Sequence, residues 1–518
     1  MNYKVDNPCT PAGLRYRFLI PMMFLVGIVP TTQAKPIDPN NPPSGRFSDD
    51  WMEIYMGGGK VGYAHSTMAR EGDRVSTFLK FHLRLGRAAQ PVTVETIQTT
   101  KETIDGKPLA FTSETNMASI KSGQRGAVHG DRVSITTSQL GMEQKKEYPF
   151  PVESLMTWGL FRESLLRGLT PGLTYTVNTY SPDLRLDGPV PAVTTIGDRE
   201  EFSLRGKAVK ARRVTMVMES AIGTMKMISW VDEDATALKS KLPIPGLGDM
   251  VLLAADEKTA LSDFVPPEMF MTSVVKLKES IDYKNARRIT YRITGRSKDV
   301  SFDDLPETDA QKIIKRDESG VDLALSRVKH SFTKTRRRNH PDQSALSEFL
   351  SANLMINVND PELIELAHRA SDGEKNPFVL ADKLRRFVTD YVDEKNLNIG
   401  FASASEVART REGDCSEHGV LLAALGRISG LPSRVAVGLA YVPVFGNQKN
   451  IFGYHMWTQF YIDGRWIDFD AALRESDCSP IRIAFATSSL KNAGLADLTL
   501  PLLSKIGAIE IQVMKVEE

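Results

Sequence analysis

The sequence has 518 residues, of which 41% are hydrophobic and 25% charged, and its formal net charge is +1. This length exceeds one ordinary hydrophobic core and predicts two or three domains. The balanced charge excludes a generally basic surface, and we expect no nucleic-acid partner.

The first 34 residues have the pattern of a secretory signal peptide. Arg15 and Arg17 precede a 12-residue apolar run at 18–29 (FLIPMMFLVGIV), and a short segment of small and polar residues ends at Ala34. The run is shorter than the roughly 20 residues that a helix needs to cross a bilayer. We therefore predict cleavage after Ala34 and an exported protein, periplasmic or extracellular, without a membrane span. An uncleaved membrane anchor is the alternative.

Three cysteines occur in the chain, Cys9, Cys415 and Cys478. Removal of residues 1–34 leaves two, which is too few for a disulfide framework even in an exported protein. A Cys415–Cys478 disulfide remains one alternative for this pair. Neither CxxC nor HExxH occurs, and we expect no metal and no cofactor.

Residues 35–46 (KPIDPNNPPSGR) are typical of a linker or an arm, and 47–294 are predicted to form one or more β-rich domains. Alternating and β-branched runs such as VSTFLKFHLRL and RRVTMVMES are separated by turn residues. A helix is expected at 154–169. The GGG at 57–59 favours a turn between strands over a phosphate loop, and we find no catalytic constellation in this region.

Residues 295–343 are highly charged and are predicted to be a linker between domains. Arg336, Arg337 and Arg338 could bind an anion, but a solvated linker is the favoured interpretation. The remaining residues, 344–518, begin with helical patterns. Asp360 is a natural N-cap with Pro361 at the first helical position, and a second helix is expected at about 377–394. Helices followed by strands predict an α+β domain.

The segment REGDCSEHGVLLAALGRISG places Cys415 on the first turn of a predicted helix. Gly413 and Asp414 supply a turn and a capping side chain. Unpaired N–H groups and the helix dipole at this position favour the thiolate form of a cysteine, which is the nucleophile. The Cys415 N–H could also donate to an oxyanion.

A hairpin follows, with HMWTQFYI and RWIDFDAAL on either side of Asp463–Gly464. If these two residues form the loop, Ile462 pairs with Arg465, and His455 becomes the diagonal neighbour of Asp470 on one face. Asp468 shares that face but lies opposite Gln459, roughly 13 Å along the strand from His455. The register therefore selects Asp470 over Asp468 as the partner of His455.

These residues predict a Cys415–His455–Asp470 triad. His455 would take the thiol proton and protonate the leaving amine, while Asp470 would fix its tautomer. His418, one turn after Cys415, is expected to be a capping or surface residue. Glu417 is expected to complement the helix N-terminus, and Trp457 to form a wall of the site or simply to pack there.

The blocks GDCSEH, GYHMW and W-x-D-x-D-A, in this order, resemble the transglutaminase-like superfamily in the form common in exported bacterial proteins. The resemblance covers roughly residues 350–518. It implies a multidomain protein in which an α+β, papain-like C-terminal domain follows the β-rich region. The upstream tryptophan of the animal enzymes has no counterpart, because no tryptophan occurs between Trp230 and Trp457. An EF-hand loop is also absent from the sequence.

Two functions follow as hypotheses. In the first, the protein is an exported thiol enzyme that attacks protein or peptide amides through a thioester, by hydrolysis or by acyl transfer of the transglutaminase type. In the second, it is a catalytically idle transglutaminase-like protein used for binding or assembly.

Overall fold

The protein is described from a computed structural model. The description covers residues 36–518, apart from 88–89, 118–119, 140–141, 183, 186–187, 221–222, 245–247, 269–273, 297–299, 329–345, 395–401, 446–447, 492–497, 499–500, 503–504 and 506. The predicted signal peptide and the Arg336–Arg337–Arg338 cluster lie outside the described residues. Within the described part, no helix is both long and apolar enough to cross a membrane.

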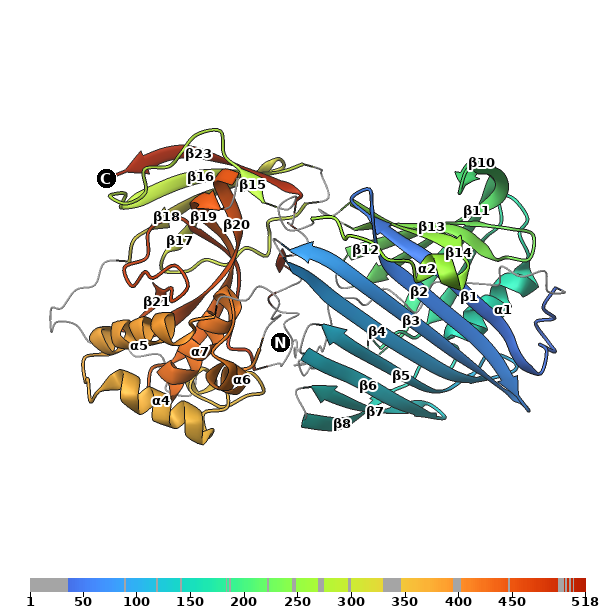
Figure 1. Cartoon of the computed structure of the whole chain (residues 1–518), viewed down its shortest axis with the longest axis horizontal. Helices are drawn as coiled ribbons and strands as arrows, with labels where there is room; N and C mark the ends of the chain where they lie inside the picture. Colours follow the sequence, from blue (N-terminus) through green and yellow to red (C-terminus); the bar gives the residue numbers. More distant parts are fainter. Residues whose placement is uncertain are drawn as a thin grey trace, which may run out of the picture.

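A 14-stranded antiparallel sheet occupies the N-terminal half (Figure 1). The chain passes through successive neighbours from β1 to β8, then returns from β9 to β14, so that β14 pairs with β1. Its strands are β1 (Gly45–Met56), β2 (Gly59–Glu71), β3 (Arg74–Arg87), β4 (Gln90–Thr103), β5 (Pro108–Met117), β6 (Ile120–His129), β7 (Arg132–Gln139), β8 (Met142–Pro149), β9 (Thr174–Thr179), β10 (Val190–Leu204), β11 (Lys207–Ser220), β12 (Gly223–Val231), β13 (Ala237–Ile244) and β14 (Gly248–Ala255).

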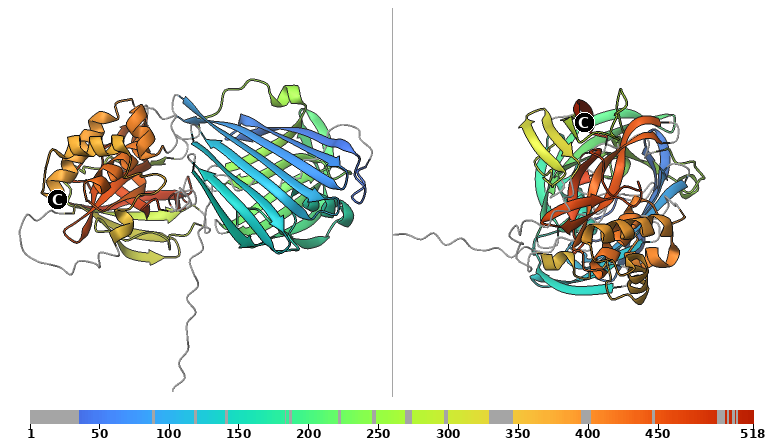
Figure 2. Two further views of the ribbon diagram at one scale, coloured as in Figure 1. Left: turned by 90° about the horizontal axis from the view of Figure 1, so that it is seen from below. Right: turned by 90° about the vertical axis from the view of Figure 1, so that its left-hand side faces the viewer.

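The sheet is strongly curved, as Figure 2 shows. Residues 150–155 connect its two edges: Phe150 N–H donates to the Asp131 carbonyl at the β7–β8 edge, and Leu155 N–H donates to Asn178 of β9. Period-two alternation turns the apolar residues of each strand to one face. The core there includes Met52, Ile54 and residues from the neighbouring strands.

Helix α1 (Thr157–Arg167) confirms the helix predicted at 154–169. Its N-cap, Met156, has no side-chain oxygen, and Glu102 of β4 takes over this role. The Glu102 carboxylate accepts the N–H groups of Trp158 and Gly159 at 2.8 Å each. Because it is fully buried, the pKa of Glu102 rises to about 7, despite these hydrogen bonds and one from Thr100.

We expect Glu102 to make folding stability fall as pH rises. Its folded pKa lies above that of an exposed carboxyl, so the folded protein keeps the proton while the unfolded chain loses it. Between pH 5 and pH 8 the ionisation of Glu102 should lower the free energy of unfolding by about 2 kcal/mol. Urea unfolding followed by circular dichroism checks this. The free energy of unfolding of the Glu102→Gln variant should not show this fall. The same pH dependence in the variant and the wild-type protein would contradict the prediction.

The C-terminal part combines helices with two smaller sheets (Figure 1). One sheet has the order β15-β20-β19-β22, with β21 also paired to β20, and the other has the order β17-β18-β16-β23. The strands are β15 (Val275–Lys276), β16 (Arg288–Gly295), β17 (Gln311–Asp317), β18 (Gly320–Ser326), β19 (Ser433–Phe445), β20 (Gln448–Ile462), β21 (Arg465–Phe469), β22 (Arg482–Ser488) and β23 (Ile509–Glu517). The helices of this part are η1 (Ser347–Phe349), α4 (Pro361–Ser371), α5 (Pro377–Tyr391), α6 (Ala404–Thr410) and α7 (Cys415–Ile428), whereas the short helix α2 (Glu257–Ala260) contacts β1 and β2 of the N-terminal sheet.

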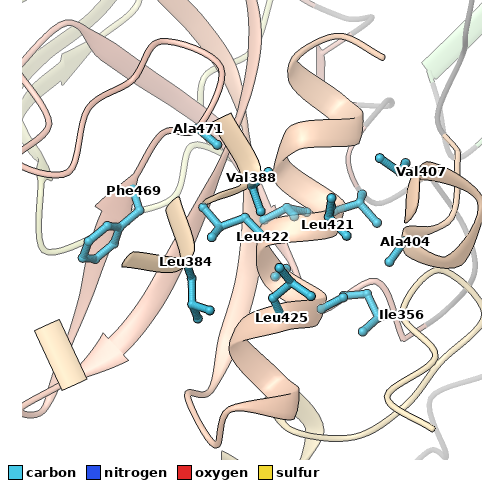
Figure 3. Packing of buried hydrophobic residues seen from close by; sticks show 14 of the residues in the cluster. Ile356, Leu384, Val388, Ala404, Val407, Leu421, Leu422, Leu425, Phe469 and Ala471 are labelled. Atoms are coloured by element: carbon cyan, nitrogen blue, oxygen red, sulfur yellow. The ribbon is translucent and has the colours of Figure 1, made fainter. Parts of the chain in front are cut away.

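Helix α7 forms the centre of this part, and all of its residues from Ser416 to Arg427 are buried. It contacts α4, α5 and α6 as well as β19 and β20. Figure 3 shows Leu421, Leu422 and Leu425 of α7 within the same cluster as Leu384 and Val388 of α5. A second core, with Tyr291, Leu323 and Leu439 among its members, joins the two sheets.

The prediction of a linker at 295–343 was wrong for its central part. Residues 311–326 form the β17–β18 hairpin, and β16, which was assigned to the N-terminal β-rich region, pairs with β18 and β23. Most of β17 is exposed, whereas β18 is mostly buried. The charged residues of β17, Lys312, Lys315, Arg316 and Asp317, therefore lie on an exposed strand at the edge of a sheet.

Residues 35–46 were predicted to be a linker or an arm, and the described residues from 36 onward form an arm. Strand β1 already begins at Gly45, and the segment before it is held by hydrogen bonds. Arg70 donates to the side chain of Asn41 and to the carbonyl of Pro42, and Arg162 donates to the carbonyl of Pro39. Its proline and asparagine residues thus belong to an arm fixed against the sheet.

Candidate active site

Cys415 is the first residue of α7, as the sequence predicted. Asp414 is the N-cap, and its carboxylate accepts the Ser416 N–H at 3.0 Å. Glu417 completes a capping box by accepting the Asp414 N–H at 2.9 Å, and it also accepts the Ala402 N–H. Burial, followed by the charge of Asp414, raises the pKa of Glu417 to about 7. Glu417 is therefore occupied in building the helix start.

The crossing of α7 over β20 requires small residues. A Cβ atom at Gly426 would lie 2.1 Å from the Phe460 ring, and one at Gly419 would lie 3.1 Å from Met456 Cγ. The two segments therefore run in the same direction through the contact. Cys415 lies one turn before Gly419, and His455 precedes Met456, so both lie toward the same end of the crossing.

The hairpin register is the one predicted. Ile462 pairs with Arg465, Gln459 with Asp468 and Thr458 with Phe469. His455 Nε2 lies 2.7 Å from Asp470 Oδ2. Since a carboxylate only accepts, Nε2–H is the donor, and Nδ1 carries the lone pair in the neutral form of the ring. The imidazole is oriented by its own hairpin.

Asp470 is buried, and both of its carboxylate oxygens are hydrogen-bonded. Oδ1 accepts the Leu473 N–H at 2.8 Å, and Oδ2 accepts from Arg482 Nε at 2.8 Å as well as from His455. Burial would raise the pKa of Asp470, but the charges of His455 and Arg482 outweigh it and hold the pKa well below the usual range. The group is therefore an anion at any ordinary pH.

Asp468 shares the strand but has a different environment. Its Oδ1 accepts from Trp457 Nε1 at 3.0 Å and from Gln459 Nε2 at 2.6 Å, and burial raises its pKa. The Trp457 ring centroid lies 6.1 Å from that of His455, so the indole packs beside the imidazole. Asp468 holds Trp457 in place and makes no hydrogen bond to His455.

His418 was expected to be a capping residue or a surface residue, and the structure shows that it does not lie at the surface. It is buried, and its Nδ1 lies 2.6 Å from the Asp414 carbonyl, where it packs against the start of α7. Cys415 and Cys478 are not joined by a disulfide, so the disulfide alternative does not describe this structure. The Cys478 thiol donates to the Asp468 carbonyl at 3.3 Å, and burial raises its pKa well above the ordinary value.

Sequence reasoning missed Arg482 and Glu475. Arg482 is almost fully buried and bonds to both Asp470 and Glu475. A signal was present in SPIRIAFATSS, where Ile481, Ile483 and Phe485 alternate with Arg482. A lone charge in a strand that is otherwise apolar or small needs a buried partner. The position of that partner could not be read from the pattern.

Comparison with protein families places this geometry in a known context. Residues 364–471 match the transglutaminase-like superfamily. This segment is therefore similar in sequence to that superfamily. The transglutaminase-like segment runs from α4 to just beyond Asp470, and it includes Cys415 and His455 but neither Glu475 nor Arg482. A search among curated proteins found no match.

Solved structures show only distant likenesses. A candidate cysteine protease from Cytophaga hutchinsonii is 17% identical, with a TM-score of 0.27, over 44% of this chain and 86% of that one. A β-barrel-like protein of unknown function from Brucella abortus is 12% identical, with a TM-score of 0.30, over 40% of this chain and 96% of its own. A candidate protease from Parabacteroides distasonis is 12% identical, with a TM-score of 0.19, over 77% and 69%.

Proposed function

We propose that the protein is a thiol enzyme that attacks amide bonds of proteins or peptides through Cys415, His455 and Asp470. The observation that carries this proposal is the 2.7 Å contact between His455 Nε2 and Asp470 Oδ2, at the end of the crossing where α7 begins with Cys415. It leaves His455 Nδ1 free to act on the thiol. The transglutaminase-like sequence of the same segment supports this assignment.

In the proposed reaction His455 Nδ1 takes the proton of the Cys415 thiol, and the thiolate attacks the amide carbonyl carbon. The negative charge on the carbonyl oxygen is stabilised by the Cys415 N–H at the start of α7. The imidazolium then gives its proton to the leaving nitrogen as the C–N bond breaks. An amine or ammonia departs, and the acyl group remains on sulfur as a thioester.

The thioester is released when water or a second amine attacks it, with His455 as the base. Water gives hydrolysis, and an amine gives acyl transfer of the transglutaminase type. Hydrolysis is the favoured outcome, since water is always available. The anion of Asp470 stabilises the imidazolium in both halves of the reaction.

We propose in addition that the C-terminal part has a papain-like arrangement, with the nucleophile at a helix start and its partners on adjacent strands. The basic, apolar and small-residue pattern of residues 1–34 supports export to the periplasm or beyond the cell. Protein and peptide chains are then the expected substrates.

Alkylation by iodoacetamide near neutral pH tests the reactivity of the thiol. We expect Cys415 to be labelled at least about ten times faster than Cys478, because thiolates react and thiols do not. Cys478 is a matched internal control, since burial raises the pKa of its thiol. Peptide mapping of the labelled protein gives both rates, and labelling in urea should make them equal. Equally slow labelling in the folded protein would instead support a binding or assembly role.

A further inference from the structure

Arg482 is a buried cation next to the proposed triad. It is the first residue of β22, and its side chain is 1% exposed. Its Nε donates to Asp470 Oδ2 at 2.8 Å, and its Nη1 donates to Glu475 Oε2 at 3.1 Å and to the Ser479 carbonyl at 3.3 Å. One guanidinium therefore connects two carboxylates and the backbone of the loop between β21 and β22.

We propose that Arg482 is a positioning residue of the thiol enzyme, which keeps Asp470 ionised and aims its Oδ2 at His455 Nε2. This inference rests on the proposed function. Arg482 lies beyond the matched segment 364–471 and acts only through Asp470.

The strand register places Arg482 near the row of residues that contains His455. Arg482 is paired with Ala440 of β19, and Ala440 is paired with Gly453 of β20. Beside them, Gly438 is paired with both Ala484 and His455. Because residues two apart in a strand share a face, Arg482 lies on the same face of the sheet as His455, one row of paired residues away.

The carboxylate cannot rotate without losing a contact. The Leu473 N–H holds Oδ1, while Arg482 and His455 share Oδ2. The backbone of Asp470 is also fixed, because it exchanges two hydrogen bonds with Glu475, at 2.8 and 2.9 Å. Both the direction and the position of the acceptor for His455 are therefore set by groups outside the His455–Asp470 pair.

Stability alone does not account for a buried guanidinium. Buried ion pairs can often be replaced by apolar residues without loss of stability, because desolvation offsets the attraction. The surroundings of Asp470 contain other charges that would oppose its ionisation if Arg482 were absent. The ionisable groups around it are His455 on β20, Asp468 on β21, Glu475 and Cys478 in the following loop, and Arg482 on β22.

Removing a fixed cation disfavours every deprotonation in this cluster. Without Arg482, the Asp470 carboxyl group should lose its proton only at a higher pH. The reactive thiolate of Cys415 should likewise form at a higher pH. A protonated Asp470 can donate a hydrogen bond, so it would no longer fix the tautomer of His455. A purely structural role for Arg482 predicts a different result, namely a lower melting temperature with an unchanged pH profile.

The test compares Arg482→Gln and Arg482→Lys with Glu475→Gln, which loosens the same loop but leaves the Arg482–Asp470 contact in place. The readout is the rate of Cys415 alkylation by iodoacetamide from pH 4 to 9, with melting temperatures measured alongside. In Arg482→Gln the acid limb of this profile should move up by about one pH unit or more. Arg482→Lys keeps the charge but loses the Nε contact, so its acid limb should stay at the wild-type pH while its alkylation rate falls. Glu475→Gln should retain both the limb and the rate.

An acid limb that stays at the wild-type pH in Arg482→Gln would overturn the inference. If that variant does not fold, Arg482→Lys decides: a wild-type limb with a lowered alkylation rate supports positioning through charge and geometry, and a fully wild-type profile and rate contradicts it. Failure of this inference can be distinguished from failure of the proposed function. If the proposed function were wrong, Cys415→Ala would keep wild-type turnover, whatever residue occupies position 482.

Discussion

Replacement of Cys415 by alanine is expected to lower peptide-amide turnover by on the order of 10⁴-fold or more, which is the usual effect of removing a nucleophile from a triad. The remaining groups can orient a substrate but cannot form the thioester. Release of aminocoumarin from a library of peptide amides measures the effect, with melting temperature as a check on folding. Cys415 is partly buried at the start of α7, so the small change to alanine should leave the helix intact.

The control is Cys478→Ala. This thiol donates to the Asp468 carbonyl and lies close to the same loop, so the variant tests whether loss of any thiol in this region disturbs activity. Turnover should stay close to the wild-type value. If Cys415→Ala kept its turnover while Cys478→Ala lost it, the assignment of the nucleophile would be wrong.

Asp470→Asn should reduce kcat on the order of 10³- to 10⁴-fold, with a small change in KM. Asparagine is neutral and cannot stabilise the imidazolium, and its amide group can present a donor to His455 Nε2. The structure offers a matched control in Asp468→Asn. Asp468 is also a buried carboxylate of the same hairpin, but it accepts from Trp457 and Gln459 and not from His455.

The comparison of the two variants is the decisive part of this measurement. Each replaces one buried carboxyl group on the same face of the sheet by an amide, so a general effect of losing a carboxyl group there would appear in both. A role through His455 predicts a large loss of kcat only in Asp470→Asn. Similar losses in the two variants, or a larger loss in Asp468→Asn, would contradict the choice that the hairpin register makes.

The local parts of the C-terminal site could be predicted because their signals are short-range. Asp414 before Cys415 predicted a helix start, and the structure confirms the start and its capping box. Asp463–Gly464 fixed the hairpin register, and that register alone distinguished Asp470 from Asp468. Each of these features depends on residues within a few positions of one another.

The features that sequence reasoning missed depend on long-range pairing. Strand β16 pairs with β23, so that Arg288 lies opposite Glu517, and no local pattern identifies this partner. The contact of Arg482 with Asp470 passes across β19 and β20 in the same way. In the N-terminal region the strands were visible, but the pairing of β1 with β14 that unites them in one sheet was not.

The central claim is that Cys415 carries the acyl group, and mass spectrometry of its peptic peptides tests it most directly. The protein is mixed with a peptide aminocoumarin amide that it turns over, quenched with acid and digested with pepsin. We predict an acyl thioester on the peptide that contains Cys415, released by hydroxylamine and absent from Cys415→Ala. Steady turnover without an adduct on Cys415, or with an equal adduct in Cys415→Ala, would contradict the account.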